Sequence, residues 1–187
     1  MSKKLSRRGG RRVRLGIAGL GMGLSHAMAS FKAPNVELAA LADMDAKILE
    51  KKKDRIVKRI GARSYKSLGS LPMYADYRRM VKEAEIDAVL VALPTSMHVS
   101  ASKFALGAGV NVLCEKPPSV KAAEMVGVAQ LSRRKGLTYM YVRQQRFEPS
   151  KQVVRRMVAG GKLGKIYHAE SKWLRSGNIP FSHGWGV

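Results

Sequence analysis

The sequence predicts an α/β fold in which helices cover both faces of a doubly wound parallel sheet. Short runs rich in valine, isoleucine, leucine and alanine recur along the chain, and longer stretches with helical spacing separate them. The runs contain few polar residues, which is typical of strands that are covered on both faces. A glycine-rich turn directly follows the first run. Strands and helices that alternate in this way form right-handed crossovers in a parallel sheet.

The first half of the chain is predicted to contain two strands and three helices. The strands cover 13–18 and 36–42, and a turn over 19–23 leads into a helix over 24–31. A charged amphipathic helix is expected over 45–60, followed by a loop or short strand over 61–72. A third helix over 74–84 places Tyr77, Met80 and Val81 on one face.

The second half continues this alternation. An apolar strand over 86–93 ends at Pro94, and a helix over 96–106 ends near Gly107. The next strand covers 110–114, Ser119 is expected to cap a helix over 120–135, and the last strand of the sheet covers 137–142. Ligands of such sheets bind at the carboxyl ends of the strands, so the residues that follow each strand are the candidate site.

The charge of the chain is unusual. Its 187 residues include 35 Lys and Arg against 13 Asp and Glu, a formal net charge of +22. Such a charge attracts polyanions and anionic substrates. No nucleic-acid-binding motif accompanies it, and four Phe and two Trp offer few surfaces for stacking. We therefore expect a solvated or phosphate-attracting surface, a disordered basic tail over 1–12, and no nucleic-acid partner.

The composition also bears on location. Cys114 is the only cysteine, so no disulfide can form within the chain, and we expect it to be a small buried apolar residue. No apolar stretch reaches the roughly eighteen residues that a membrane-spanning helix needs. We predict a cytoplasmic protein with no membrane partner and no metal site. A twin-arginine export signal around Arg7 and Arg8 is the alternative.

The turn after the first strand has the glycine spacing of a dinucleotide-binding loop. Gly19 would permit the tight turn, Gly21 would let a pyrophosphate approach the backbone, and Met22 and Gly23 lead into the helix. The N–H groups of the first helical turn would then face the phosphates. The third glycine of G-x-G-x-x-G should fall at Leu24, but a loop that is one residue shorter and uses Gly23 would restore the pattern.

Asp43 strengthens this prediction. It ends the second strand, where a carboxylate would accept hydrogen bonds from the ribose hydroxyls of the adenosine half. The alternative role is the N-cap of the following helix. Because a carboxylate repels a 2′-phosphate, Asp43 favours NAD over NADP, although Lys47 and the lysines at 51–53 would attract that phosphate.

Two further segments follow strands of the predicted sheet. Pro94, Thr95 and His98 would lie beside the cofactor, or would serve only to end the strand and begin the helix. Glu115 and Lys116 follow the next strand, where a charged pair is costly unless it is paired or faces a cleft. Lys116 would stabilise an alkoxide that develops during hydride transfer, or would form a structural ion pair with Glu115.

From residue 13 onwards the chain resembles the Gfo/Idh/MocA oxidoreductases, which include glucose–fructose oxidoreductase and inositol dehydrogenases. The Glu115-Lys116-Pro117 run is the most specific part of this resemblance. The matching segments are 74–78, 86–89, 92–94, His98, 108–109, 112–117, 145–147 and 161–166.

The resemblance implies an NAD(P)-binding Rossmann domain and oxidation or reduction at a sugar or polyol hydroxyl. It implies that Lys116 is the catalytic lysine beside the nicotinamide and the substrate, and that Glu115 and Pro117 hold its strand end. Arg146 would shape the substrate side, and His26 would match the histidine that follows the glycine loop, which favours the shorter loop. Thr95 stands where the family usually has Asn.

The family continues into a second domain, which supplies an Asp and a His near the lysine. We predict a Rossmann domain over 13–147, followed over 148–187 by a linker helix and the first strand, 165–174, of an apparently truncated second domain. A complete second domain would mediate homo-oligomerisation. The alternative function is a dinucleotide-binding module, or a truncated fragment, that lacks the remaining catalytic residues.

Overall fold

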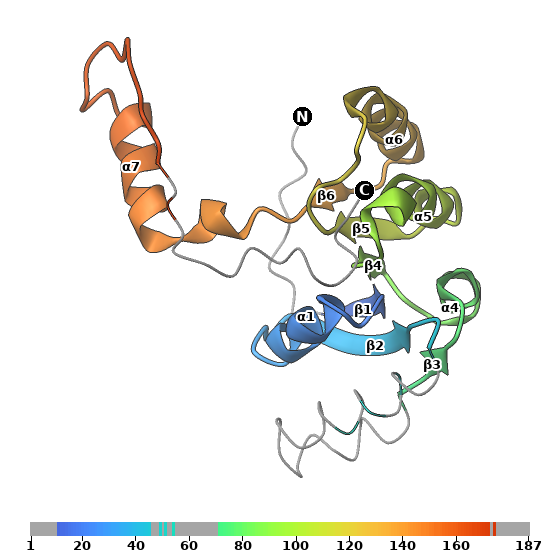
Figure 1. Ribbon diagram of the computed structural model, residues 1–187. Coiled ribbons are helices and arrows are strands. Elements are labelled where there is room, and N and C mark those ends of the chain that lie inside the picture. The colour runs from blue at the N-terminus through green and yellow to red at the C-terminus, as the bar shows by residue number, and fades with distance from the viewer. Residues whose placement is uncertain are drawn as a thin grey trace. The chain divides into compact units, whose positions relative to one another are not determined.

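Six parallel strands form one sheet in the order β3-β2-β1-β4-β5-β6 (Figure 1). The computed structural model describes residues 11–45, 49, 51, 54, 71–172 and 174. The strands are β1 (Val13–Ala18), β2 (Val36–Ala42), β3 (Met73–Tyr74), β4 (Ala88–Val91), β5 (Asn111–Cys114) and β6 (Tyr139–Tyr141). The order reverses between β1 and β4, which creates the crevice where doubly wound sheets bind their ligands.

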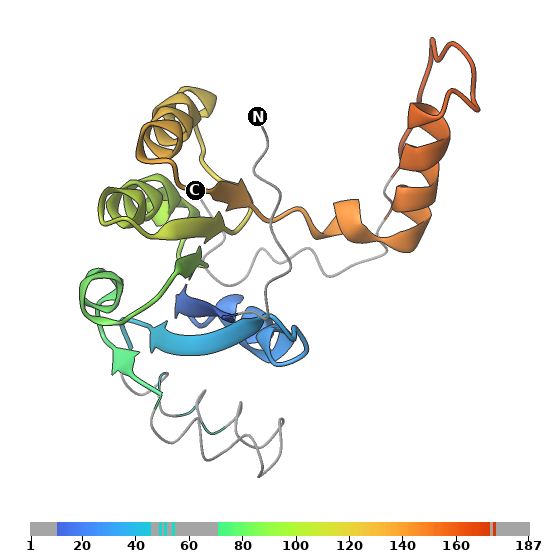
Figure 2. The same ribbon diagram turned by 180° about the vertical axis from the view of Figure 1, so that it is seen from behind.

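Helices cover both faces of this sheet, as predicted. Helix α1 (Gly23–Ser30) lies on one face, whereas α4 (Tyr77–Glu83), α5 (Thr95–Gly107) and α6 (Ala122–Lys135) lie on the other (Figures 1 and 2). Each face has its own apolar core. Ile17, Leu20 and Ala27 belong to the core beneath α1, and Met80 and Leu106 belong to the core beneath α4 and α5.

The observed elements differ from the predicted ones mainly at their ends. Helix α4 begins three residues later than predicted, because Tyr74 pairs in β3 and the Asp76 side chain caps the helix by accepting a hydrogen bond from Arg78 N. The predicted cap at Ser119 is wrong. Helix α6 begins at Ala122 after Lys121, and Ser119 Oγ instead accepts from Lys121 N and donates to Glu124 Oε2. The predicted helix over 45–60 lies largely outside the described residues.

A second compact unit begins at Arg143. It contains the 3-10 helix η1 (Gln144–Phe147) and α7 (Pro149–Ala159), and the division at 142/143 precedes the predicted boundary at 147/148. The described residues 165–172 do not form the predicted strand, since a strand is defined by hydrogen bonds to a neighbouring strand and none of these residues pairs with one. Within the described ranges, no helix is long and apolar enough to cross a membrane.

Candidate functional site

The glycine loop joins the end of β1 to the start of α1. Gly19 has φ +90°, and a Cβ atom there would lie 2.5 Å from the carbonyl oxygen of Ala92. Its N–H donates to the Ala42 carbonyl at 2.8 Å, so the loop begins against the ends of both β2 and β4. Only glycine fits this position without moving backbone.

The other two glycines have different surroundings. A Cβ atom on Gly21 would meet nothing within 4 Å, whereas one on Gly23 would lie 2.8 Å from Ile17 Cγ2. Gly21 therefore leaves its side of the loop open, and Gly23 allows α1 to pack closely on β1. This is the geometry of the shorter loop, with Gly23 as the third glycine. Met22, in the N-cap position, is 42% exposed at the edge of this opening.

Asp43 connects the end of β2 to the glycine loop. Its Oδ2 accepts a hydrogen bond from Leu20 N at 2.7 Å, and its Oδ1 accepts one from Asp45 N at 3.3 Å. The first bond fixes the carboxylate beside the loop. The second is a local turn bond of the kind that Asp makes before a helix. One conformation of Asp43 is thus compatible with both predicted roles, the acceptor for the ribose hydroxyls and the cap of the following helix.

His98 occupies the space between two loops. It is 1% exposed, its Nε2 lies 2.7 Å from the Leu93 carbonyl oxygen, and its Nδ1 lies 2.7 Å from the Pro117 carbonyl oxygen. Both ring nitrogens therefore face the protein backbone. This geometry argues against the predicted direct contact of His98 with a cofactor. Instead, the imidazole links the segment after β4 to the segment after β5.

Glu115 is held from the opposite face of the sheet. Its carboxylate is buried, with Oε1 2.5 Å from His26 Nε2 and Oε2 accepting from Lys116 N at 2.9 Å. Its own N–H donates to the Val91 carbonyl. Glu115 thus contacts α1 and the backbone of Lys116, while the Lys116 side chain is exposed. His26 on α1 and His98 on α5 thus both contact the Glu115-Lys116-Pro117 segment.

The remaining residues named in the sequence analysis do not take part in the contacts around Asp43, His98 and Glu115 described above. Pro94 precedes α5, Thr95 is its first residue, and no side chain caps this end of the helix. Arg146 lies on η1 in the second compact unit. Cys114 is fully buried, and burial raises the pKa of its thiol to about 11. It is therefore a core residue, as predicted, and not a nucleophile.

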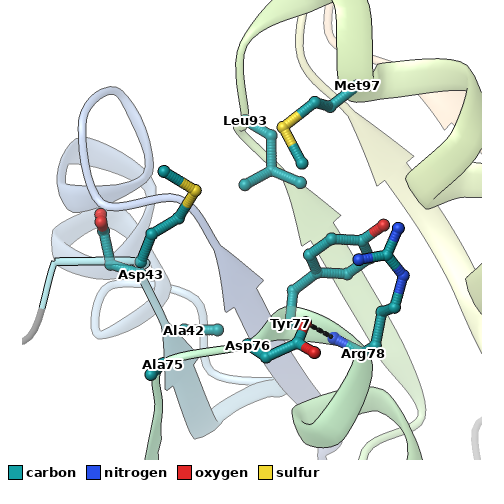
Figure 3. A pocket seen from close by; sticks show the side chains of 9 residues that line it. Ala42, Asp43, Ala75, Asp76, Tyr77, Arg78, Leu93 and Met97 are labelled. Atoms are coloured by element: carbon teal, nitrogen blue, oxygen red, sulfur yellow. Dashed lines mark hydrogen bonds between the residues drawn. The ribbon is translucent and has the colours of Figure 1, made fainter.

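A pocket of about 230 Å³ opens between the ends of β2 and β4 (Figure 3). Its wall includes Asp43, Met44, Tyr77, Arg78, Leu93 and Met97. Of these, only Asp43 was predicted as a site residue. The sequence placed Tyr77 in the core, and its position in α4 gave no signal for a site. Leu93 and Met97, by contrast, flank the predicted segment at 94–95.

The same region of the chain is similar to known proteins. Residues 13–142 match the profile of the GFO_IDH_MocA group, described as an oxidoreductase family with an NAD-binding Rossmann fold. The chain belongs to this family. The resemblance inferred from the Glu115-Lys116-Pro117 run is thereby confirmed, and so is the doubly wound fold class. The cofactor that this Rossmann domain binds is a nicotinamide dinucleotide, NAD or NADP.

Several relatives in this family are known. The chain is 32% identical over 119 residues to D-glucoside 3-dehydrogenase of Escherichia coli (strain K12), covering 64% of this chain and 33% of that one. It is 31% identical over 158 residues to the rhizopine catabolism protein MocA of Rhizobium meliloti, covering 83% and 45%. A structure of scyllo-inositol dehydrogenase from Lactobacillus casei with NAD(H) and scyllo-inositol has a TM-score of 0.70 at 27% identity, covering 82% and 43%. The chain spans less than half the length of these relatives.

The site fits a dinucleotide. Gly21 leaves room beside the backbone, α1 begins at the same loop, and Asp43 offers a carboxylate at the end of β2. The pocket beyond Asp43 is mainly apolar, which suits a flat heterocyclic base. Within the described ranges, no three His, Cys, Asp or Glu side chains group as metal ligands would.

Proposed function

We propose that this chain forms the cofactor-binding half of an oxidoreductase that transfers hydride between a nicotinamide and a sugar or polyol. The observation that carries this proposal is the junction of the glycine loop with the Lys116 segment. His26, in the first turn of α1, contacts Glu115, whose carboxylate also accepts from Lys116 N. The first turn of α1, which would bind the phosphates, and Lys116 are thereby brought to one edge of the sheet.

The cofactor would lie across this edge. The pyrophosphate would lie against Gly21 and the start of α1, where N–H groups and the helix dipole favour an anion. Asp43 would accept hydrogen bonds from the ribose hydroxyls of the adenosine half. The adenine would enter the pocket bounded by Met44, Leu93 and Met97. This arrangement favours NAD over NADP, because the carboxylate would repel a 2′-phosphate.

Lys116 would act on the substrate. When bound, the nicotinamide supplies the hydride chemistry, so the protein has to handle the proton and the developing charge. The exposed Lys116 ammonium would donate a hydrogen bond to the substrate hydroxyl oxygen and stabilise it as alkoxide character develops. Glu115, His26 and His98 would position the backbone of this lysine. Arg146 would contribute to the substrate side.

The proposed substrate class comes from the relatives. Relatives of this chain include D-glucoside 3-dehydrogenase and D-xylose 1-dehydrogenase (NADP(+)), and a similar structure contains scyllo-inositol. A cytoplasmic location, homo-oligomerisation and the absence of a nucleic-acid partner stay predictions. A second candidate function is dinucleotide binding without turnover, which would use the glycine loop, Asp43 and the pocket but not Lys116.

A paired measurement tests the proposal. Turnover with NAD or NADP is followed over a panel of sugars and polyols for the wild type and for Lys116→Met, with the NADH affinity of each measured alongside. In a protein that also carries the second domain of the family, we expect Lys116→Met to lower turnover by roughly two to three orders of magnitude and to change affinity little. NADH binding without any turnover would favour the second candidate. A destabilised variant with normal turnover would remove Lys116 from catalysis.

A further inference from the structure

His98 is a buried titratable side chain whose two ring nitrogens both contact the backbone. It lies near the start of α5 and is 1% exposed. Its Nε2 lies 2.7 Å from the Leu93 carbonyl oxygen, and its Nδ1 lies 2.7 Å from the Pro117 carbonyl oxygen. Such distances are typical of hydrogen bonds in which the donor is charged. Each contact therefore requires a hydrogen between the nitrogen and the oxygen.

The two partners of the ring are both acceptors. A carbonyl oxygen cannot donate a hydrogen bond, so the imidazole has to donate to both of them. A neutral imidazole carries one N–H, and its other nitrogen presents a lone pair. In either tautomer, one carbonyl oxygen would face this lone pair at 2.7 Å. Only the imidazolium, with an N–H on each nitrogen, forms a hydrogen bond to both carbonyl groups.

Opposing effects act on a positive charge at this position. Burial disfavours it, and so does the nearby start of α5, where the helix dipole favours anions. Two hydrogen bonds from a charged donor favour it, because each is about twice as strong as a bond between neutral groups. The buried Glu115 carboxylate, on the same segment as Pro117, supplies an opposite charge. We expect these favourable terms to outweigh the cost of burial.

The segments that the ring joins carry few other titratable groups. Residues 92–97, after β4, contain none. Residues 114–118 contain Glu115, the exposed Lys116 and Cys114, whose thiol stays protonated because burial raises its pKa to about 11. Glu115 is in turn paired with His26 of α1. A second proton on His98 would therefore be the main positive charge buried beneath the Lys116 segment.

We propose that His98 is held as an imidazolium, and that its two N–H groups position the Lys116 segment against the segment after β4. His98 is a positioning residue, because it acts on Lys116 through the carbonyl group of the adjacent Pro117. A ring that lost one N–H would release either Pro117 or Leu93. The distance between the two segments would then no longer be fixed from α5. The inference rests on the proposed function for the role of Lys116, whereas the charge of the ring does not.

The first experiment observes the protons on the ring directly. The chain is labelled with nitrogen-15 histidine, and the ring nitrogens are observed by NMR at about pH 8, where an ordinary histidine is mostly neutral. The other histidines are replaced in turn to assign the signals, so no His98 variant is needed. The exposed His168 is the matched control. His98 should show two protonated nitrogens, whereas His168 should resemble a neutral ring. A single protonated nitrogen on His98 would overturn the inference.

The second experiment measures positioning with His98→Gln. The glutamine amide is neutral and donates from one nitrogen only, so it cannot donate to both carbonyl groups from the two sides of a ring. Ser102→Ala is the matched control, because it removes another buried polar group one turn further along α5. The backbone amide signal of Lys116 should shift in His98→Gln and stay at its wild-type position in Ser102→Ala.

Turnover gives the kinetic counterpart, in a protein that also carries the second domain of the family. His98→Gln should lower kcat by about tenfold, the effect of losing one hydrogen bond from a charged donor, and should leave NADH affinity nearly unchanged. A folded His98→Gln with the wild-type Lys116 amide signal and the wild-type kcat would overturn the positioning role. A wild type that shows the imidazolium but neither binds NADH nor turns over would support the charge of His98 and contradict the proposed function.

Discussion

The Nε2 atom of His26 lies 2.5 Å from Oε1 of Glu115, although the two residues are 89 positions apart in the sequence. This contact joins the first turn of α1 to the end of β5. It links the loop that would hold the cofactor phosphates to the segment that carries Lys116. The stability of the Lys116 segment should therefore depend on a side chain near the phosphate site.

Replacing His26 with Ala should destabilise the fold by about 1–3 kcal/mol, because the buried Glu115 carboxylate loses one of its hydrogen-bond partners. His26→Gln, which retains an N–H donor, should lose less. Urea unfolding measures the difference, with the exposed His168 changed to Ala as the control. Equal unfolding free energies for wild type and His26→Ala would mean that the contact adds nothing to stability.

Two glycines of the loop, Gly21 and Gly23, should respond differently to substitution. Gly23→Ala should cost about 1–3 kcal/mol, because the new methyl group would lie 2.8 Å from Ile17 Cγ2. Gly21→Ala should be nearly neutral for folding, since its Cβ would meet nothing within 4 Å. Thermal unfolding of the two variants tests this order. If Gly21→Ala is the less stable of the two, the described loop geometry is incorrect.

Asp43→Asn should alter cofactor preference more than folding. The amide oxygen can still accept from Leu20 N, but the charge that repels a 2′-phosphate is gone. We expect the ratio of NADH affinity to NADPH affinity to fall by roughly an order of magnitude. This is about the factor in affinity by which a hydrogen bond to a charged group exceeds one to a neutral group. Fluorescence titration with both dinucleotides gives the ratio. An unchanged ratio would separate Asp43 from the ribose.

The Cys114 thiol should be unreactive in the folded protein. Its pKa is raised from the ordinary value of 9.0 to about 11, chiefly by burial. The folded state thus binds this proton more tightly than the unfolded state, so stability from this group is present below pH 9 and is lost as the pH rises towards 11. Alkylation should be slow at pH 8 and fast in urea. Rapid alkylation of the native protein at pH 8 would contradict the buried position.

Much of the fold followed from local sequence patterns. The apolar runs predicted β1 and β2 with their observed bounds, because strands buried on both faces need uninterrupted apolar residues. The helix ends were harder, since Asp76 and Ser119 form their caps and turns through side chains whose partners depend on the folded backbone. The strand predicted over 165–174 could not be judged from its residues alone, because a strand also needs a neighbour.

The site was predictable where it follows strands. Asp43 and the Glu115-Lys116 pair come directly after apolar runs, and the topology of the sheet brings these ends to one edge. The contacts that organise the site were not predictable. His26 reaches Glu115 across the sheet, His98 turns away from the surface to bind two carbonyl groups, and Tyr77 lies at both a core and a pocket. Such contacts arise from tertiary packing, which spacing along the chain does not reveal.

The most direct test of the central claim is a calorimetric titration of this chain with NADH, performed in parallel on Gly21→Val. The wild type should bind NADH at a single site. Gly21→Val should not bind, because its side chain would occupy the open space beside the loop where the pyrophosphate would lie. Circular dichroism should show the same fold for both proteins. Equal NADH binding by the wild type and a folded Gly21→Val would contradict the assignment of this loop to the cofactor.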